Sequence, residues 1–228
     1  LKQALDMLLD RVVANQMKNN VDGAAPYPAN NGYWCYTGPN CRDSSTTQLV
    51  MAGLASARAV YISAQFADAP RAAALDAATT LARQAYERNG TPGDYRGFSQ
   101  TNYGSDPGPT YGCGNLAGEK GHGYNAGNEN SIQQTASGLW IQLVGGAGPN
   151  WPNVQSYMRW LRHRYRWDDI NAGYFDAGWG SSYWYYLWSS FKAYQFLVDS
   201  NIAPTAGNIG VADIGNLPSA SAPSCPDR

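Results

Sequence analysis

The chain has 228 residues, of which 43% are hydrophobic and 14% are charged, so it is long enough and apolar enough to fold around a core. Its 16 basic and 17 acidic side chains leave a net charge of −1, which gives no electrostatic reason to expect a nucleic acid or an anionic membrane as a partner. No apolar run approaches the roughly 20 residues that span a bilayer.

Hydrophobic residues at helical spacing predict a first helix over residues 1–18, which begins with Leu and not with a signal peptide; we therefore expect a mature or trimmed product. A loop over 19–39 follows and holds Tyr33, Trp34 and Tyr36. The next helix is predicted over 45–64, with Ser44 or Ser45 as its N-cap.

A third helix is predicted to start at Pro70 and to end before Gly90. Residues 90–128 then form a long loop that is rich in Gly, Tyr and Asn. Three more helices are expected over 131–144, 151–166 and 182–199, and the last stretch, 200–228, reads as an extended tail. No segment alternates convincingly between apolar and polar residues, so the predicted class is all-α, with one domain over 1–199 and a tail over 200–228.

The four cysteines favour disulfide bonds over a metal site. Cys35 and Cys41 flank a turn-forming stretch, and Cys113 and Cys225 lie in Gly-, Pro- and Ser-rich segments where a second bridge would tie the tail down. Zinc is the alternative, but the chain has no CxxC pair and only two histidines. We therefore expect an oxidising, extracytoplasmic compartment, either the periplasm or the exterior, with no metal or cofactor.

Two segments of the chain resemble each other. "DSSTTQLVMAGLASA" and "ENSIQQTASGLW" superpose when Gly53 is aligned with Gly138, so that Gln48 meets Gln133. Each segment is a hydroxyl-rich cap followed by a small, apolar helix, and each precedes a more charged helix. A helix that is apolar nearly all round belongs inside and its charged successor outside, so the repeat predicts stacked inner–outer helix pairs.

These segments resemble the inner-helix entries of the prenyltransferase and squalene-cyclase repeats, and "VQSYMRWLRHRY" and "SYWYYLWSSFKAY" are similar to helices of further pairs. The resemblance implies an α/α-toroid, open or partial because only six helices are predicted. The family's catalytic motifs are missing. "WDDIN", with Asp168 and Asp169, lacks the form of the cyclase acid motif, and Cys113, His122 and Asp176 do not match the zinc ligands of the protein prenyltransferases.

The strongest catalytic candidates lie in the loop before residue 131. Glu119, His122 and Tyr124, with Lys120 and Asn125 nearby, would suit a polysaccharide lyase, in which an amide holds a uronate and Tyr or His moves the proton. The alternative is that His122 and Tyr124 anchor a glycine-rich loop through hydrogen bonds.

Carboxylates offer a second set of candidates. Three of them precede proposed inner helices and would suit a hydrolase, although capping of the helix N-termini explains them better; they are Asp43, Glu129 and Asp176. A calcium site at Asp94 and Asp106 has no loop motif to support it.

The aromatic residues point to a binding surface. The chain has eight Trp and 16 Tyr against five Phe, and rings with a polar group suit partly wet clefts and interfaces as well as hydrogen-bonded cores. The rings around residues 179–188 cannot all face one core, so some should meet a cavity, a subunit or a ligand. The candidate ligand or interface residues are Trp34, Tyr36, Trp179, Tyr183, Trp184 and Trp188.

Taken together, these patterns predict an extracytoplasmic binding or scaffolding subunit on an α/α-toroid, with other protein subunits as partners. A glycan-active enzyme, lyase before hydrolase, is the alternative. An isoprenoid-active enzyme comes third, because it needs an apolar cavity and an acid that the sequence does not offer.

Overall fold

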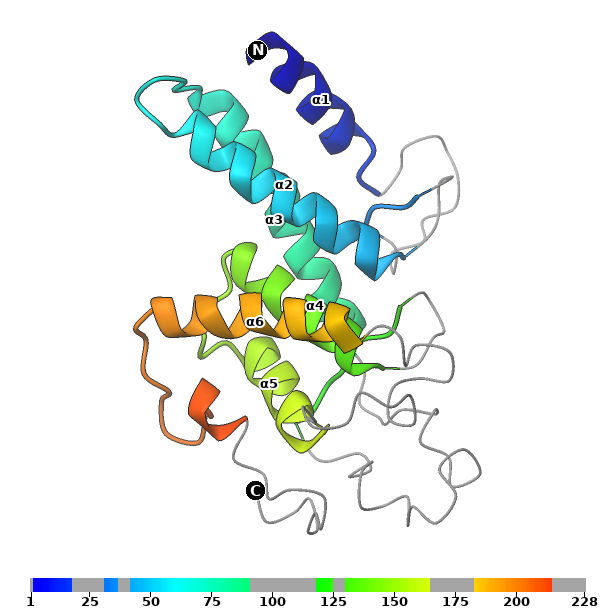
Figure 1. Cartoon of the computed structure of the whole chain (residues 1–228), viewed down its shortest axis with the longest axis vertical. Helices are drawn as coiled ribbons and strands as arrows, with labels where there is room; N and C mark the ends of the chain where they lie inside the picture. The colour runs from blue at the N-terminus through cyan, green and yellow to red at the C-terminus, as the bar shows by residue number, and fades with distance from the viewer. Residues whose placement is uncertain are drawn as a thin grey trace.

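The computed structural model describes residues 2–17, 31–36, 42–90, 118–124, 130–164 and 183–214, apart from the side chains of residues 163, 164 and 183. Over these ranges the chain is all-helical, with two isolated β-bridges and no strand, so the predicted all-α class is confirmed. Its elements are α1 (Lys2–Ala14), α2 (Ser44–Tyr61), α3 (Ala69–Asn89), α4 (Ile132–Val144), α5 (Pro152–Arg164), α6 (Tyr183–Asp199) and the 3-10 helix η5 (Val211–Asp213) (Figure 1). None of the described helices is long and apolar enough to cross a membrane.

Helix α4 is the centre of the structure. It contacts α2, α3, α5 and α6, and in Figure 1 it lies behind α6. All side chains from Ile132 to Leu143 are buried, and none of them is charged. A helix surrounded in this way must be apolar or internally hydrogen-bonded on every face, which is why the sequence pattern marked it as an inner helix.

Gly138 allows two tyrosines to pack directly on α4. A Cβ atom at this position would lie 2.7 Å from the ring atoms of both Tyr86 and Tyr157, which come from α3 and α5. Tyr157 also donates its hydroxyl to the backbone oxygen of Tyr86 at 2.9 Å, so the three helices meet at this point. The repeat partner, Gly53 on α2, has open space around it. The repeated glycine is therefore a packing requirement in one of the two copies only.

The N-terminus of α2 is capped by Asp43, so the prediction of Ser44 or Ser45 as the N-cap is wrong. The Asp43 carboxylate accepts a hydrogen bond from the Thr46 amide at 2.7 Å, as expected for an acidic group at a helix start. With the cap supplied one residue earlier, Ser44 is free to point into the core. Helix α4 begins with an equivalent cap, since Ser131 accepts from the Gln134 amide at 3.2 Å.

Helix α1 ends at Ala14, four residues before the predicted end. The reason is Gln16, which is buried and donates its amide to the backbone oxygens of Gly32 and Ala78 at 3.1 and 2.8 Å. A continued helix would orient this side chain differently. The helix therefore ends before Gln16, whose side chain connects the end of α1 to Ala78 of α3.

Residues 200–214 pack back onto the helices. Gln155 of α5 exchanges two hydrogen bonds with the backbone of Ile209, at 3.0 and 2.8 Å. Ile214 is buried beyond η5, which contacts α6. The first part of the predicted tail thus belongs to the packed structure.

The two repeated glycines give a matched stability test. Gly138→Ala should lower the free energy of unfolding by about 1–3 kcal/mol, because the new methyl group would force Tyr86 and Tyr157 apart. Gly53→Ala should raise it by about 0.5–1 kcal/mol, because alanine favours the helix and meets no neighbour. Urea denaturation followed by circular dichroism measures both. Equal effects of the two substitutions would contradict the packing described for α4.

Candidate functional site

His122, the predicted catalytic base, lies in the core among α2, α3 and the segment at residue 33. Its side chain is 0% exposed and stacks on the Tyr86 ring, with the centroids 4.3 Å apart. Nδ1 lies 2.7 Å from the Gly123 carbonyl oxygen, and Nε2 lies 2.7 Å from the Tyr33 hydroxyl. Because a carbonyl only accepts, Nδ1 carries the proton and Nε2 accepts from Tyr33.

This environment keeps His122 neutral. Burial, with a smaller contribution from the charge of Arg42, lowers its pKa to about 3. Burial also raises the pKa of Tyr33, so the phenol keeps the proton that it donates. Both ring nitrogens are hydrogen-bonded away from solvent, an arrangement that holds a loop in place and gives no access to a substrate.

The segment around His122 holds the N-termini of two helices, α2 and α4. The Ser131 amide donates to the His122 oxygen at 3.0 Å, and the Ser44 amide donates to the Tyr124 oxygen at 3.1 Å. Ser44 also donates its hydroxyl to the Gly123 oxygen at 3.0 Å. One short stretch of backbone therefore sets the positions of the N-termini of both α2 and α4.

A polar cluster lies at this end of the helices, and we name it the rim cluster: Tyr36, Asp43, Ser45 and Tyr124. Tyr124 and Ser45 donate their hydroxyls to the two oxygens of Asp43 at 3.0 and 2.9 Å. Tyr36, which is 66% exposed, lies 3.4 Å from Ser45 through its own hydroxyl. Partial burial and the neighbouring Asp43 raise the pKa of Tyr124, so its hydroxyl is a donor at neutral pH.

The three residues of the predicted lyase site have different surroundings. The Tyr124 hydroxyl joins the rim cluster, the His122 ring turns into the core, and Glu119 is buried. The carboxylates Glu129 and Asp176, the pairs Asp168–Asp169 and Asp94–Asp106, and Asn125 lie outside the described residues. Within the described ranges, no group of three or more His, Cys, Asp or Glu side chains is placed to hold a metal ion.

A second polar network joins α2, α4 and α6 below the rim. Ser137 donates to the Gln48 side-chain oxygen at 2.7 Å, and Gln48 donates its amide to Ser189 at 3.0 Å. The Tyr185 hydroxyl also donates to Gln48. The repeat alignment singled out Gln48 as a cap-proximal residue, but only the packing reveals its three partners. Buried polar groups that are paired in this way fix which helix faces meet.

The predicted aromatic residues divide into buried and exposed ones. Trp34 is buried and donates its indole N–H to the Val12 oxygen at 2.7 Å, which makes it an anchor for α1. Trp184 and Trp188 on α6 are 71% and 42% exposed. Phe191, which the sequence analysis did not single out, is 64% exposed on the same helix. Trp179 lies outside the described residues, as does the Tyr183 side chain.

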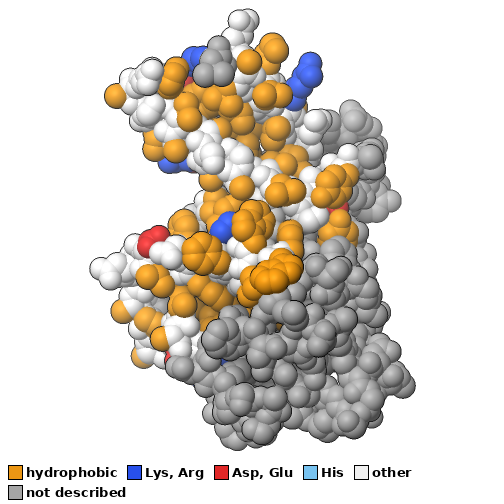
Figure 2. All heavy atoms as spheres, viewed as in Figure 1, with side chains coloured by type: hydrophobic (Ala, Val, Ile, Leu, Met, Phe, Trp, Pro, Cys, Tyr) orange, Lys and Arg blue, Asp and Glu red, His pale blue; other side chains and the backbone are white. Residues whose placement is uncertain are grey.

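Hydrophobic side chains gather along α6 on the face shown in Figure 2. Lys192 is their one charged neighbour between residues 183 and 198. Its ammonium lies 4.0 Å from the Trp140 ring centroid and 3.2 Å from that of Trp188, and among the described residues it has no hydrogen-bond acceptor. Burial lowers its pKa to about 7, whereas the two indole faces favour the charged form. Lys192 thus holds the Trp188 ring in place.

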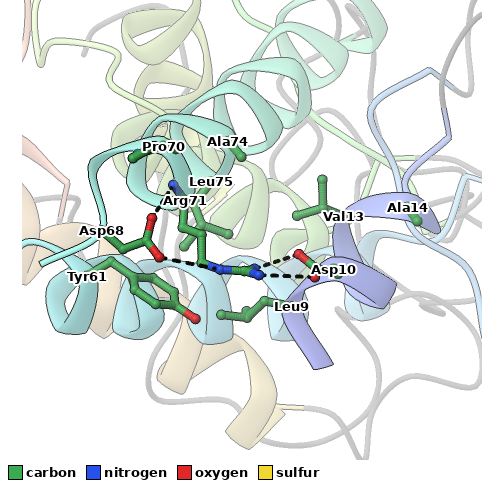
Figure 3. Close-up of a pocket in the computed structure, with 10 residues that line it drawn as sticks. All are labelled: Leu9, Asp10, Val13, Ala14, Tyr61, Asp68, Pro70, Arg71, Ala74 and Leu75. Atoms are coloured by element: carbon green, nitrogen blue, oxygen red, sulfur yellow. Dashed lines mark hydrogen bonds and ion pairs between the residues drawn. The ribbon is translucent and has the colours of Figure 1, made fainter. Parts of the chain in front are cut away.

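A pocket of about 540 Å³ lies between α1 and α3 (Figure 3). Arg71 crosses it and pairs with Asp10 at 2.6 Å, and with Asp6 and Asp68 at 3.3 and 3.6 Å. Leu9, Val13 and Leu75 supply apolar lining. Because Arg71 of α3 pairs with Asp6 and Asp10 of α1, these ion pairs connect the two helices.

Cys35 is disulfide-bonded. Cys41, Cys113 and Cys225 lie outside the described residues, so the predicted pairing remains a prediction.

The buried His122 gives the protein a predictable response to acid. The unfolded state takes up a proton near pH 6.5 and the folded state near pH 3, so the free energy of unfolding should fall as the pH drops between these values. The expected slope is about 1.4 kcal/mol per pH unit. Asp6 and Asp68, whose pKa values are lowered, add their effect mainly below pH 3.8.

Urea titrations between pH 7 and pH 4.5 measure this slope. His122→Asn should reduce stability at pH 7 but flatten the dependence on pH, because it removes the group that takes up the proton in the unfolded state. A wild-type slope equal to that of His122→Asn would contradict the buried neutral state.

Comparisons of this chain with protein-family models, with curated proteins and with solved structures found no match.

Proposed function

We propose that the chain is a binding or scaffolding domain, built as an open α/α-toroid of inner and outer helix pairs, that binds a protein partner through α6. The observation that carries this proposal is the exposure of Trp184, Trp188 and Phe191 together on that helix. Tryptophan and phenylalanine are enriched at protein interfaces, while charged residues are depleted from their centres. The face of α6 has this composition.

The sequestration of His122 weighs against the enzymatic alternative. A general base must reach the proton that it abstracts and titrate near the working pH. The His122 ring is fully buried, both of its nitrogens are hydrogen-bonded, and its pKa is lowered to about 3. The Asp43 carboxylate already accepts hydrogen bonds from the Thr46 amide at the cap of α2 and from the hydroxyls of Ser45 and Tyr124.

An extracytoplasmic location is part of the proposal. A disulfide at Cys35 supports it, because structural disulfides persist in oxidising compartments. Other protein subunits of a larger assembly are the partners that the α6 face suits.

A glycan is the second candidate ligand, and the rim cluster is the observation that favours it. Tyr36 offers an exposed ring for stacking on a sugar, and Ser45, Tyr124 and Asp43 offer hydroxyls and a carboxylate beside it. This candidate needs no catalytic role for His122.

Replacement of one exposed indole tests the protein-binding proposal. In a pull-down from the source organism, a protein that binds the wild type is first identified and purified, and Trp184→Ser should weaken its binding by about tenfold or more, because an interface tryptophan contributes about 2 kcal/mol. Ile62→Ser is the matched control, since Ile62 is 58% exposed but follows α2 at its C-terminal end, away from α6. Calorimetry of the purified partners measures both. Equal affinities of Trp184→Ser and wild type would contradict the proposed use of α6.

The glycan candidate has its own test. If the rim cluster binds sugars, acidic or neutral oligosaccharides should bind the wild type, and Tyr36→Ala should reduce the affinity about tenfold by removing the stacking ring. Trp184→Ser should leave that affinity unchanged. Isothermal calorimetry against a panel of oligosaccharides measures it, and binding that resists Tyr36→Ala would exclude the rim cluster as the site.

A further inference from the structure

The exposed residues of α6 follow the spacing of a helix-pairing seam. Trp184, Trp188, Phe191, Gln195 and Val198 are separated by four, three, four and three residues, and all five are exposed. This 4–3 spacing repeats every seven residues, which is the pattern of the a and d positions that face a partner helix. The opposite face of α6 is already buried and includes Tyr186, Ala193 and Leu197. Helix α6 thus has one face for its own chain and a second face in solvent.

The five seam residues are uncharged, and one exposed carboxylate, Asp199, stands at the C-terminal end of α6. Lys192 is the only charged residue between 183 and 198, and its ammonium is buried between Trp140 and Trp188. Gln195, the polar member of the seam, donates its amide to Asp199 at 2.7 Å. Two copies of this face can therefore approach each other without bringing like charges together, and the net charge of −1 adds little repulsion.

The order of side chains along the seam is self-complementary in the antiparallel direction. The N-terminal half presents the two indoles, and the C-terminal half presents Gln195 and Val198. A two-fold axis near Phe191 would set Trp184 opposite Val198 and Trp188 opposite Gln195, so that large rings meet smaller side chains in both halves. A parallel pairing would set each indole against its own copy.

The exposed area fits this arrangement. If a fully exposed aromatic side chain offers about 200 Å², the three rings supply about 350 Å² per copy. Val198 is 59% exposed, and Gln195 is exposed as well. Two copies that bury these five side chains would remove about 1,000 Å² from solvent, which is the least area that a specific interface needs.

We propose that two copies of this chain associate through an antiparallel pairing of their α6 helices about an axis near Phe191. The inference deepens the proposed function by identifying the protein partner as a second copy. The Trp188 ring is already fixed over Lys192, so less side-chain freedom is lost when the interface forms.

Sedimentation equilibrium of the full chain across a micromolar dilution series tests the proposal. The wild type should approach twice the chain mass of 24.7 kDa. Phe191→Glu should weaken the dimer by about 100-fold, because it sets two carboxylates together at the axis. Ile62→Glu is the control, with the same new charge on an exposed residue outside the seam. Circular dichroism establishes that each variant keeps its helices.

Two further variants test the direction of pairing. Trp184→Glu and Val198→Lys should each weaken self-association, and a mixture of the two should recover a heterodimer, because the antiparallel register places the new carboxylate beside the new ammonium. Recovery of a dimer in the mixture supports the antiparallel pairing, and no recovery overturns it.

The outcomes separate this inference from the proposed function. A monomeric wild type, or a dimer that survives Phe191→Glu, overturns the pairing through α6. If the wild type is a monomer but binds a different purified protein, and if Trp184→Ser weakens that binding, the proposed binding function stands without the dimer. If neither a second copy nor any purified partner binds, both proposals fail.

Discussion

Burial of α4 on all sides is the constraint on which the rest of the structure depends. A helix with four helical neighbours has no solvent-facing side on which to place charge, and it tolerates side-chain bulk only where a neighbour leaves room. Gly138 provides that room for Tyr86 and Tyr157, so α3 and α5 are fixed relative to each other through α4. The polar contacts of Ser137 with Gln48 then set the position of α2, and the partners of Gln48 set that of α6.

The packing of α2 against α4 also determines the environment of His122. Because α2 and α4 start side by side, the short segment at residues 122–124 reaches both N-termini and must be held rigidly to do so. His122 performs that task with a neutral ring between Tyr33 and Gly123. A catalytic imidazole needs a ring nitrogen that the substrate can reach. An imidazole that holds a loop in place needs both ring nitrogens to be hydrogen-bonded within the protein. The aromatic residues Trp184, Trp188 and Phe191 of α6, in contrast, are largely exposed.

Helical periodicity predicted all six helices, because it depends on the local spacing of apolar residues. The repeat predicted that both of its helices would be buried, which is true of α4, whereas Leu49 on α2 is 52% exposed. The cap of α2 was misassigned by one residue, since Asp43, Ser44 and Ser45 are all good caps and only the tertiary contacts of Ser44 with Gly123 decide among them. The hydrogen-bonded anchoring role of His122 was one of the two sequence interpretations. Its partners could not be predicted, because Tyr33 and Tyr86 lie 89 and 36 residues away in sequence. The exposure of the Phe191 side chain was not predicted, because it depends on which face of α6 packs against α4.

The two isolated β-bridges pair the backbone just before the N-termini of α2 and α4. Trp34 pairs with Asp43 just before α2, and Gly123 pairs with Asn130 just before α4. The bridges, the caps and the hydrogen bond from the Ser44 amide to the Tyr124 oxygen together fix where α2 and α4 begin. Each of these helix starts is thus held twice, once by its side-chain cap and once by the pairing of the backbone just before it.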